Sequence, residues 1–411
     1  MIWKTLARRG PRGALFFLAF LAVGSFTSRS AHAQPLRLRA DALAESRSPA
    51  GIVVLQGEDN VRPWLSVEGL VWTGARANPI GAPSGAQVDP TGDVLSLQVK
   101  LRHPKGWAEV RAGRFVLTTG ALLPVQIDGG SALARLPFGM NVEVFGGAPT
   151  VPRFKTVPFD WLIGGRVSQS IGHHLTAGVA YQQRRSHGDL ANEELGADLN
   201  AALGESIDLG GRATYDLVSV GIADARATLS WRGKKLRVEG FASHRVPGRL
   251  LPATSLFSVL GDFPSDMVGG TVRWQMFPRL DILGSGAGQV VGGTAGYNAW
   301  LRGTLRLDDT GAGNVGVEVR RQDVSTAQWT GLRATGMKPF LKVFHVAAEV
   351  EVVFPDYPSG RGKMWPWGLL AVGWRPGHGW EAAAAIEASA SPERKYSVDA
   401  LVRVSKTLEV R

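Results

Sequence analysis

Apolar and polar residues alternate with a period of two along most of the chain beyond residue 60. In 207–217, for example, Leu209 and Tyr215 fall on one face of an extended chain, and Asp208 and Arg212 fall on the other. This period is typical of β-strands, because successive side chains of a strand point to opposite faces. The pattern therefore predicts an all-β protein.

The length of the alternating segments distinguishes a membrane barrel from a soluble sheet. We count roughly 16–18 segments, most of them alternating over 9–13 residues. They are 64–74, 93–102, 107–117, 140–147, 161–171, 174–185, 195–203, 207–217, 223–232, 235–246, 267–277, 279–291, 295–308, 314–324, 343–354, 364–375, 380–390 and 396–405. Soluble strands average about 5–6 residues, whereas a tilted strand that crosses a bilayer needs about 9–11. Segment length favours a transmembrane barrel.

The connections between segments fall into two kinds. Tight turns are predicted at 171–172, 233–234 and 277–278, and long loops at 75–92, 119–138, 185–194, 247–265 and 355–363. Outer-membrane barrels have short periplasmic turns at one end and longer extracellular loops at the other. Residues 34–411 are therefore predicted to form one antiparallel β-barrel of about 16–18 strands. Residues 34–61 form either a periplasmic segment or the first strands.

The two faces of the segments differ in composition. The apolar face is rich in Gly and Ala, and the polar face carries both signs of charge. Aromatic residues gather at segment ends, as in the interfacial girdles of membrane barrels. They are Trp64, Trp72, Trp107, Trp161, Trp231, Trp365, Trp367, Trp374 and Trp380. A secreted β-sandwich or propeller also alternates in this way and stays as the alternative.

Residues 1–33 have the pattern of a secretory signal peptide. A basic stretch from Lys4 to Arg12 precedes an apolar core over 14–23, and Ala31-His-Ala33 gives a small-x-small cleavage pattern. The apolar run is too short for a membrane-spanning helix, which needs about 20 residues. We expect export and cleavage near Ala33.

Charge and cysteine content narrow the chemistry. The net charge of the 411-residue chain is +11, of which five positive charges belong to the leader, leaving about +6. The absence of cysteine excludes disulfides and thiolate metal ligands. Basic residues are interleaved with acids, which argues against nucleic-acid binding. No catalytic motif accompanies the histidines, so we expect neither enzymatic activity nor a cofactor or metal site.

The chain resembles the Gram-negative outer-membrane β-barrels of the porin-like class. The resemblance is one of architecture over about 36–411, and locally Arg111-Ala-Gly-Arg114-Phe115, a loop and Asn141-Val-Glu-Val-Phe-Gly-Gly147 are similar to strand–loop–strand units of such barrels. It implies insertion into the cell outer membrane by the barrel assembly machinery and contact with outer-membrane lipid and lipopolysaccharide.

Alternation places many charged residues on the inward face of such a barrel. The candidates for lining the lumen are Arg212, Arg226, Arg273, Arg302, Arg306, Arg403, Asp208, Asp216, Glu349 and Asp399. They could form cross-strand ion pairs that stiffen the wall, or a field that selects solutes. The loop 120–139, with Asp128 and Arg135, could fold inward as a constriction or lie outside.

These patterns lead to one leading function and two alternatives. The leading hypothesis is a passive porin-like channel for small hydrophilic solutes, with a mixed-charge, Arg-rich lumen. The first alternative is an export conduit for a polysaccharide that works with a periplasmic partner. The second is a non-conducting structural barrel of an envelope complex. The sequence leaves the oligomeric state open.

Overall fold

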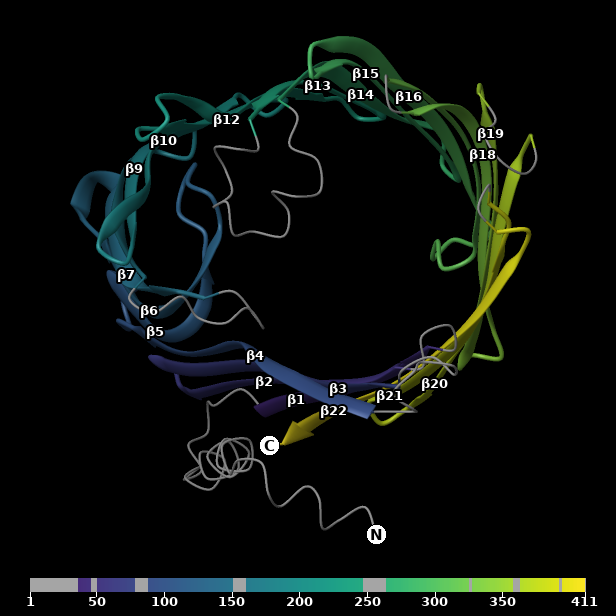
Figure 1. Cartoon of the computed structure of the whole chain (residues 1–411), viewed down its shortest axis with the longest axis horizontal. Coiled ribbons are helices and arrows are strands. Elements are labelled where there is room, and N and C mark those ends of the chain that lie inside the picture. The colour runs from purple at the N-terminus through teal and green to yellow at the C-terminus, as the bar shows by residue number, and fades with distance from the viewer. Residues whose placement is uncertain are drawn as a thin grey trace.

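One closed antiparallel sheet accounts for nearly all of the structure. The computed structural model describes residues 36–45, 50–77, 88–150, 160–246, 264–324, 327–357, 363–391 and 394–410. In these ranges 22 strands form a single sheet, and its first and last strands pair with each other. The result is the ring of Figure 1. The predicted signal peptide lies outside the described residues.

The strands are 10 to 15 residues long and follow one another around the ring. The first eleven are β1 (Leu36–Glu45), β2 (Ala50–Arg62), β3 (Leu65–Ala77), β4 (Val88–Arg102), β5 (Ala108–Leu117), β6 (Val125–Arg135), β7 (Met140–Pro149), β8 (Trp161–Ile171), β9 (Leu175–Ser186), β10 (Asp189–Leu203) and β11 (Ile207–Asp216). The others are β12 (Gly221–Arg232), β13 (Leu236–Arg245), β14 (Ser265–Phe277), β15 (Leu280–Val291), β16 (Thr294–Arg306), β17 (Asn314–Val324), β18 (Ala327–Phe340), β19 (Phe344–Pro355), β20 (Trp365–Gly377), β21 (Trp380–Ser389) and β22 (Ser397–Val410).

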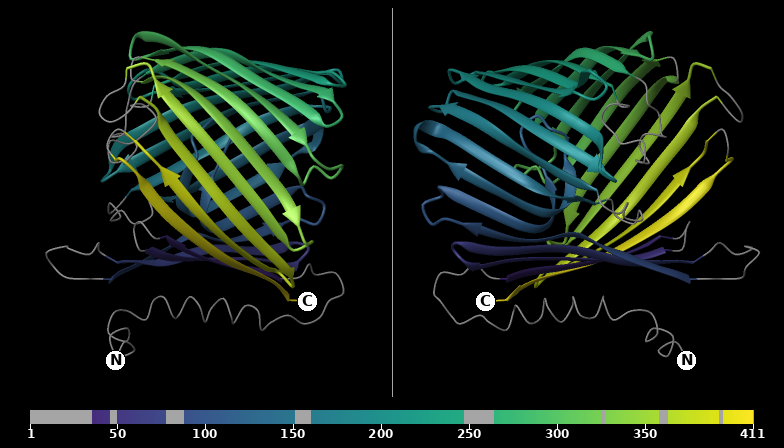
Figure 2. Two further views of the ribbon diagram at one scale, coloured as in Figure 1. Left: turned by 90° about the vertical axis from the view of Figure 1, so that its right-hand side faces the viewer. Right: turned by 60° about the vertical axis from the view of Figure 1, so that its left-hand side comes forward.

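Each strand pairs with its neighbours in sequence, so the barrel is a succession of hairpins. Figure 2 shows the strands steeply tilted against the barrel axis. The ring closes where β1 pairs with β22, from Leu36 opposite Val410 to Glu45 opposite Leu401. Closure gives the edge strands partners for their backbone N–H and C=O groups.

A short 3₁₀ turn, η3 (Pro137–Gly139), is the one helical element among the described residues. No helix in the described ranges is long and apolar enough to cross a membrane.

The predicted fold class is confirmed, and the predicted strand number is too low. Every predicted alternating segment coincides with a strand, but the barrel has 22 strands where 16–18 were predicted. The additional strands are β1, β2, β6 and β18. Residues 36–45 and 50–62 are thus the first strands of the sheet.

The two ends of the barrel differ in their connections. At one end, ten connections of two to seven residues join β2 to β3, β4 to β5 and so on, and the start of β1 and the end of β22 lie at this same end. The predicted tight turns are confirmed here, at 172–174, 233–235 and 278–279. The longest connections, 78–87, 150–160, 246–264 and 356–364, join strands at the other end and fall mostly outside the described residues.

Two predicted long loops are wrong. Most of 119–138 is strand β6, and 185–194 belongs to β9 and β10, which are joined by the two-residue turn His187–Gly188. Both turn residues have positive φ, 53° and 93°. This is the backbone of a tight hairpin turn whose twist matches that of the flanking strands.

The outward face is apolar along the middle of the barrel and aromatic at both ends. Side chains at mid-strand are 53–58% exposed; they are Leu229, Leu301, Val317, Val350, Leu370 and Ile386. Exposed aromatics near the short-turn end are Trp231, Trp274, Phe340, Trp374 and Trp380. Those near the other end are Trp161, Tyr181, Tyr215, Tyr297 and Phe354. An apolar band between two aromatic girdles is the surface of a transmembrane barrel.

Candidate functional site on the inner wall of the barrel

The connection between β5 and β6, residues 118–124, identifies the inner face of the barrel. The Thr119 hydroxyl donates to Glu143 on β7 at 3.3 Å, and the Thr214 hydroxyl on β11 donates to the Ala121 carbonyl at 2.6 Å. So short a segment reaches from β5 to β11 only by crossing one face of the sheet, and Figure 1 shows it inside the ring. The face with Glu143 and Thr214 is therefore the inner one. We call 118–124 the inward segment.

A small apolar core holds the inward segment against the wall. Its members come from the segment and from β5 to β9; they are Phe115, Leu117, Leu122, Ile127, Phe145, Leu162 and Ala180. Ile127 and Leu162 are fully buried. Because this core removes apolar surface from water on an otherwise polar wall, it fixes the position of the segment.

The predicted constriction needs correction. Only 118–124 folds inward, and Asp128 and Arg135 lie on β6. Asp128 is on the face opposite Ile127 and binds Arg114 of β5, with 2.7 Å between Asp128 Oδ1 and Arg114 Nε. Arg135 lies at the far end of β6, where it donates to the carbonyl of Gly106 at 2.7 Å. Neither residue belongs to the inward segment, because the strand pattern continues through 125–135.

Seven of the ten predicted lumen residues form ion pairs. The pairs are Arg212–Asp224 (3.6 Å), Asp208–Arg232 (2.7 Å), Arg273–Asp281 (3.9 Å), Arg306–Asp281 (2.6 Å), Arg302–Glu318, Arg333–Glu349 and Arg403–Asp41 (2.7 Å). Each joins inward side chains of neighbouring or nearby strands. Such cross-strand pairs stabilise a sheet by about 0.2–1 kcal/mol each. A role for these residues in conduction stays a prediction.

The other three predicted residues have different surroundings. Asp216 accepts the backbone N–H of Val218 at 2.8 Å and that of Ser219 at 3.2 Å, which orders the turn after β11. Asp399 accepts the Ser397 hydroxyl at 3.2 Å. Arg226 is exposed, and its direct cross-strand partner is another arginine, Arg212.

Sequence reasoning missed two inner-wall residues that form ion pairs, Asp41 and Arg166. Asp41 of β1 accepts from Arg403 and Ser405 across the closing pair of strands. Arg166 of β8 binds Asp198 at 2.6 Å. Residues 36–45 alternate regularly, and Arg166 lies within the predicted segment 161–171, so the pattern of both stretches was readable in the sequence.

A polar recess of about 580 Å³ lies between the inward segment and the wall formed by β8 and β10–β13. Its lining residues are Gly120, Arg166, Asp198, Asn200, Gly210, Gly211, Arg212, Arg226, Thr228 and Glu239. A smaller recess, of about 260 Å³, lies at the short-turn end. It is strongly basic and is lined by Arg232, Gly233, Lys234, Lys235, Leu236, Arg237, Arg273, Gln275, Asp281 and Arg306. Both recesses concentrate positive charge on the inner wall.

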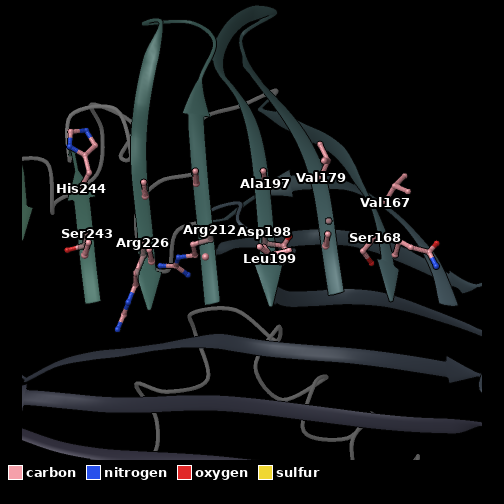
Figure 3. Close-up of a pocket in the computed structure, with 18 of the residues that line it drawn as sticks. Val167, Ser168, Val179, Ala197, Asp198, Leu199, Arg212, Arg226, Ser243 and His244 are labelled. Carbon is pink, nitrogen blue, oxygen red and sulfur yellow. The ribbon is translucent and has the colours of Figure 1, made fainter. Parts of the chain in front are cut away.

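Figure 3 shows the lining of a larger hollow in the same wall, which shares Arg226, Arg212 and Asp198 with the polar recess. Arg226, Arg212 and Asp198 lie on neighbouring strands at one level, and the strand register places them directly opposite one another. The hollow, of about 1070 Å³, is lined by this row together with outward residues such as Val167 and Val179. The wall is therefore apolar on one side and charged on the other at the same height.

The described residues hold no group of three or more His, Asp and Glu side chains arranged to bind a metal ion.

Comparison with known proteins shows the fold. No protein-family profile and no curated protein sequence matches the chain. The FrpB iron transporter from Neisseria meningitidis is similar in structure, with a TM-score of 0.56 and 10% identity over 91% of this chain and 82% of that one. A PapC-PapD-PapK-PapG intermediate of P pilus tip assembly from E. coli contains a chain that gives a TM-score of 0.54 and 9% identity. That match covers 94% of this chain and 62% of the other.

At such identities the likeness is one of fold. The closed sheet, its hairpin order and these neighbours show that the chain is a large closed antiparallel β-barrel.

Proposed function

We propose that the protein is an outer-membrane channel for small hydrophilic solutes and has no enzymatic activity. The observation that carries this proposal is the opposite character of the two faces of the wall. Outside, an apolar band lies between two aromatic girdles; inside, ion pairs follow one another from strand to strand. The apolar outward surface suits contact with lipid, and the charged inward surface suits contact with water.

The size of the barrel supports an aqueous lumen. A closed sheet of 22 strands, spaced about 4.8 Å apart and tilted by about 40°, has a backbone diameter of about 40–45 Å. Side chains from one wall fall far short of the other. The inward segment lies against the wall and narrows the lumen only locally.

The ends of the barrel indicate its orientation. Short turns and both ends of the described sheet lie together, which in outer-membrane barrels is the periplasmic end. The longer connections then face outward from the cell. In this orientation the apolar band contacts outer-membrane lipid and lipopolysaccharide, after export by way of the leader and insertion by the barrel assembly machinery.

Planar-bilayer recording of refolded residues 34–411 tests the proposal. We expect stepwise conductance from protein whose gel mobility changes on heating, as that of closed barrels does. Folded, heat-modifiable protein that passes no current would overturn the channel. That result would favour a structural barrel, or a conduit for a polysaccharide that opens only with a periplasmic partner.

A further inference from the structure

The polar recess has the layout of a small binding site. Its floor is Gly210 of β11, whose neighbours across the ladder are Asn200 of β10 and Thr228 of β12. A Cβ atom added at Gly210 would lie 2.9 Å from Thr228 Oγ1. The absence of a side chain at this one position therefore opens the floor of the recess, and an amide and a hydroxyl flank it.

The next inward row of the wall is charged, and its charges do not cancel. Arg212 and Arg226 lie directly opposite each other in the register of β11 and β12. Like charges in this position destabilise a sheet. Two carboxylates lie near Arg212: Asp224, at 3.6 Å, and Asp198, its cross-strand neighbour on β10. Within the part of the chain that the structure describes, no carboxylate comes within ion-pair distance of Arg226.

The two carboxylates that line the recess bind arginines other than Arg212 and Arg226. Asp198 accepts from Arg166 through both of its oxygens, at 2.6 and 3.2 Å. Glu239 binds Arg237 at 3.3 Å. The recess therefore presents two guanidinium groups with an excess of positive charge.

The inward segment closes one side of the recess. A Cβ atom added at Gly120, where φ is +56°, would lie 2.6 Å from both Arg166 Nε and Asp198 Oδ2. The segment thus packs directly on this ion pair and holds it in place. The remaining side is open to the lumen, so a solute can enter from the water-filled interior.

We propose that this recess binds the oxyanion group of a small solute, a carboxylate or a phosphate, between Arg212 and Arg226. Guanidinium groups bind such oxygens through paired, charge-assisted hydrogen bonds. The anion removes the repulsion between the two arginines, and Asn200 and Thr228 contact the polar remainder of the solute. This site rests on the proposed channel and gives it a substrate class, because a lumen this wide can select solutes only at its wall.

Titration calorimetry of the detergent-folded barrel tests the site without requiring conduction. The probes are inorganic phosphate and succinate, titrated separately, and the response to each tells which oxyanion the recess prefers. We expect at least one of them to bind wild-type protein. Arg212→Gln and Arg226→Gln should each weaken that binding at least tenfold, and Gly210→Val should abolish it by filling the floor.

Two controls separate the recess from the general field of the wall. Arg245→Gln removes the same charge from another inward, exposed position on β13, and Gly240→Val adds the same side chain on the outward face of β13, where an added Cβ atom meets nothing within 4 Å. Both should bind within twofold of wild type. Binding that Arg245→Gln weakens as much as Arg226→Gln would overturn the site, and heat-modifiable gel mobility verifies the folding of each variant.

The outcome for the site is separable from the outcome for the channel. A barrel that conducts and binds neither phosphate nor succinate overturns the recess while the channel stands. A barrel that binds one of them and passes no current supports the recess and overturns the channel.

Discussion

Arginines on the inner wall differ in whether a carboxylate or another arginine faces them across the sheet. Arg302 lies opposite Glu318, and its Nε donates to that carboxylate at 2.5 Å, whereas Arg226 lies opposite Arg212. Arg306 is likewise paired, with Asp281. Ion pairs such as Arg302–Glu318 stabilise the sheet, whereas Arg226 is one of the two arginines that we propose to bind an oxyanion.

Charge reversal should therefore have opposite effects at the two positions. Arg302→Glu places a carboxylate against Glu318 and should lower the free energy of unfolding by at least about 1 kcal/mol. Arg226→Glu creates a pair with Arg212 and should leave that free energy unchanged or raise it by about 0.2–1 kcal/mol. Urea unfolding of the barrel in lipid vesicles measures both. Equal losses would mean that cross-strand neighbours do not determine the stability of the wall.

The turn between β16 and β17 depends on one carboxylate at the short-turn end. Asp308 accepts the Thr310 hydroxyl at 2.6 Å and the backbone N–H groups of Gly313 and Ala312 at 2.6 and 3.1 Å. The Thr310 hydroxyl, together with these N–H groups, holds the pKa of Asp308 below its ordinary value, although desolvation opposes the effect.

Because the pKa of Asp308 is lowered, the turn should lose stability as the pH falls. The pKa of Asp308 is lower in the folded protein than in the unfolded chain. Its carboxylate therefore stabilises the turn fully at pH values above the pKa of the unfolded chain. This stabilisation is lost as the pH falls through the pKa of the folded protein. The protection of the Gly313 amide, measured as its exchange rate relative to the intrinsic rate at each pH, should therefore fall on acidification. In Asp308→Asn the Gly313 amide should be poorly protected already at neutral pH, and its protection should no longer depend on pH. In the neighbouring variant Asp309→Asn the protection should depend on pH as in the wild type. Wild-type exchange that follows only the intrinsic pH rate would contradict the prediction.

At the scale of elements, regular alternation made most of the strands predictable. The four missed strands either lack clear alternation of apolar and polar residues or precede residue 60, where the predicted segments begin. β2 contains the continuous apolar run Ile52–Leu55, β6 lies in the stretch 119–138 that was predicted to be a loop, and β18 ends with a proline before its last residue. Alternation does not identify such stretches as strands. They become strands because they pair with neighbouring strands whose alternation is regular.

Adjacent residues of one strand face opposite sides of the wall and so lie in different environments. Leu229 of β12 is 53% exposed on the outward face, and Thr228 beside it faces the recess. Leu229→Arg should destabilise the barrel by about 2–4 kcal/mol if the residue lies near the bilayer midplane, whereas Thr228→Arg should fold with a yield close to that of wild type. The fraction of heat-modifiable protein after refolding compares the two. Equal yields would show that the faces of β12 are reversed.

The inward segment is an element that no periodicity could reveal, since it depends on contacts with strands distant in sequence. Leu122 is 4% exposed and belongs to the apolar core beneath the segment. Leu122→Ala should release residues 118–124 and expose their amides to hydrogen exchange, with strand amides at β16 unchanged. Removing a buried leucine typically costs about 2–5 kcal/mol, here mainly in local order. Protection retained in 118–124 would show that its hydrogen bonds suffice.

At the scale of the whole molecule, the sequence predicted a barrel and charged inward rows but not the candidate site. The recess depends on which residue of β10 faces which residue of β11 and β12, and on a segment from β5 that closes it. Alternation assigns a side chain to a face but says nothing about register between strands. The opposition of Arg212 and Arg226 therefore becomes visible only when the strands are aligned.

The pairing of β1 with β22 has a consequence for how the molecule folds. Arg403 binds Asp41 across that pair, and the two residues are 362 positions apart in the chain. Hairpins between successive strands need only short loops to close, but this pair needs nearly the whole polypeptide, with the corresponding loss of chain entropy. Contacts of such high sequence separation form slowly. The last step of folding is therefore the meeting of two exposed strand edges, and until then the nascent sheet can pair with any other edge it encounters.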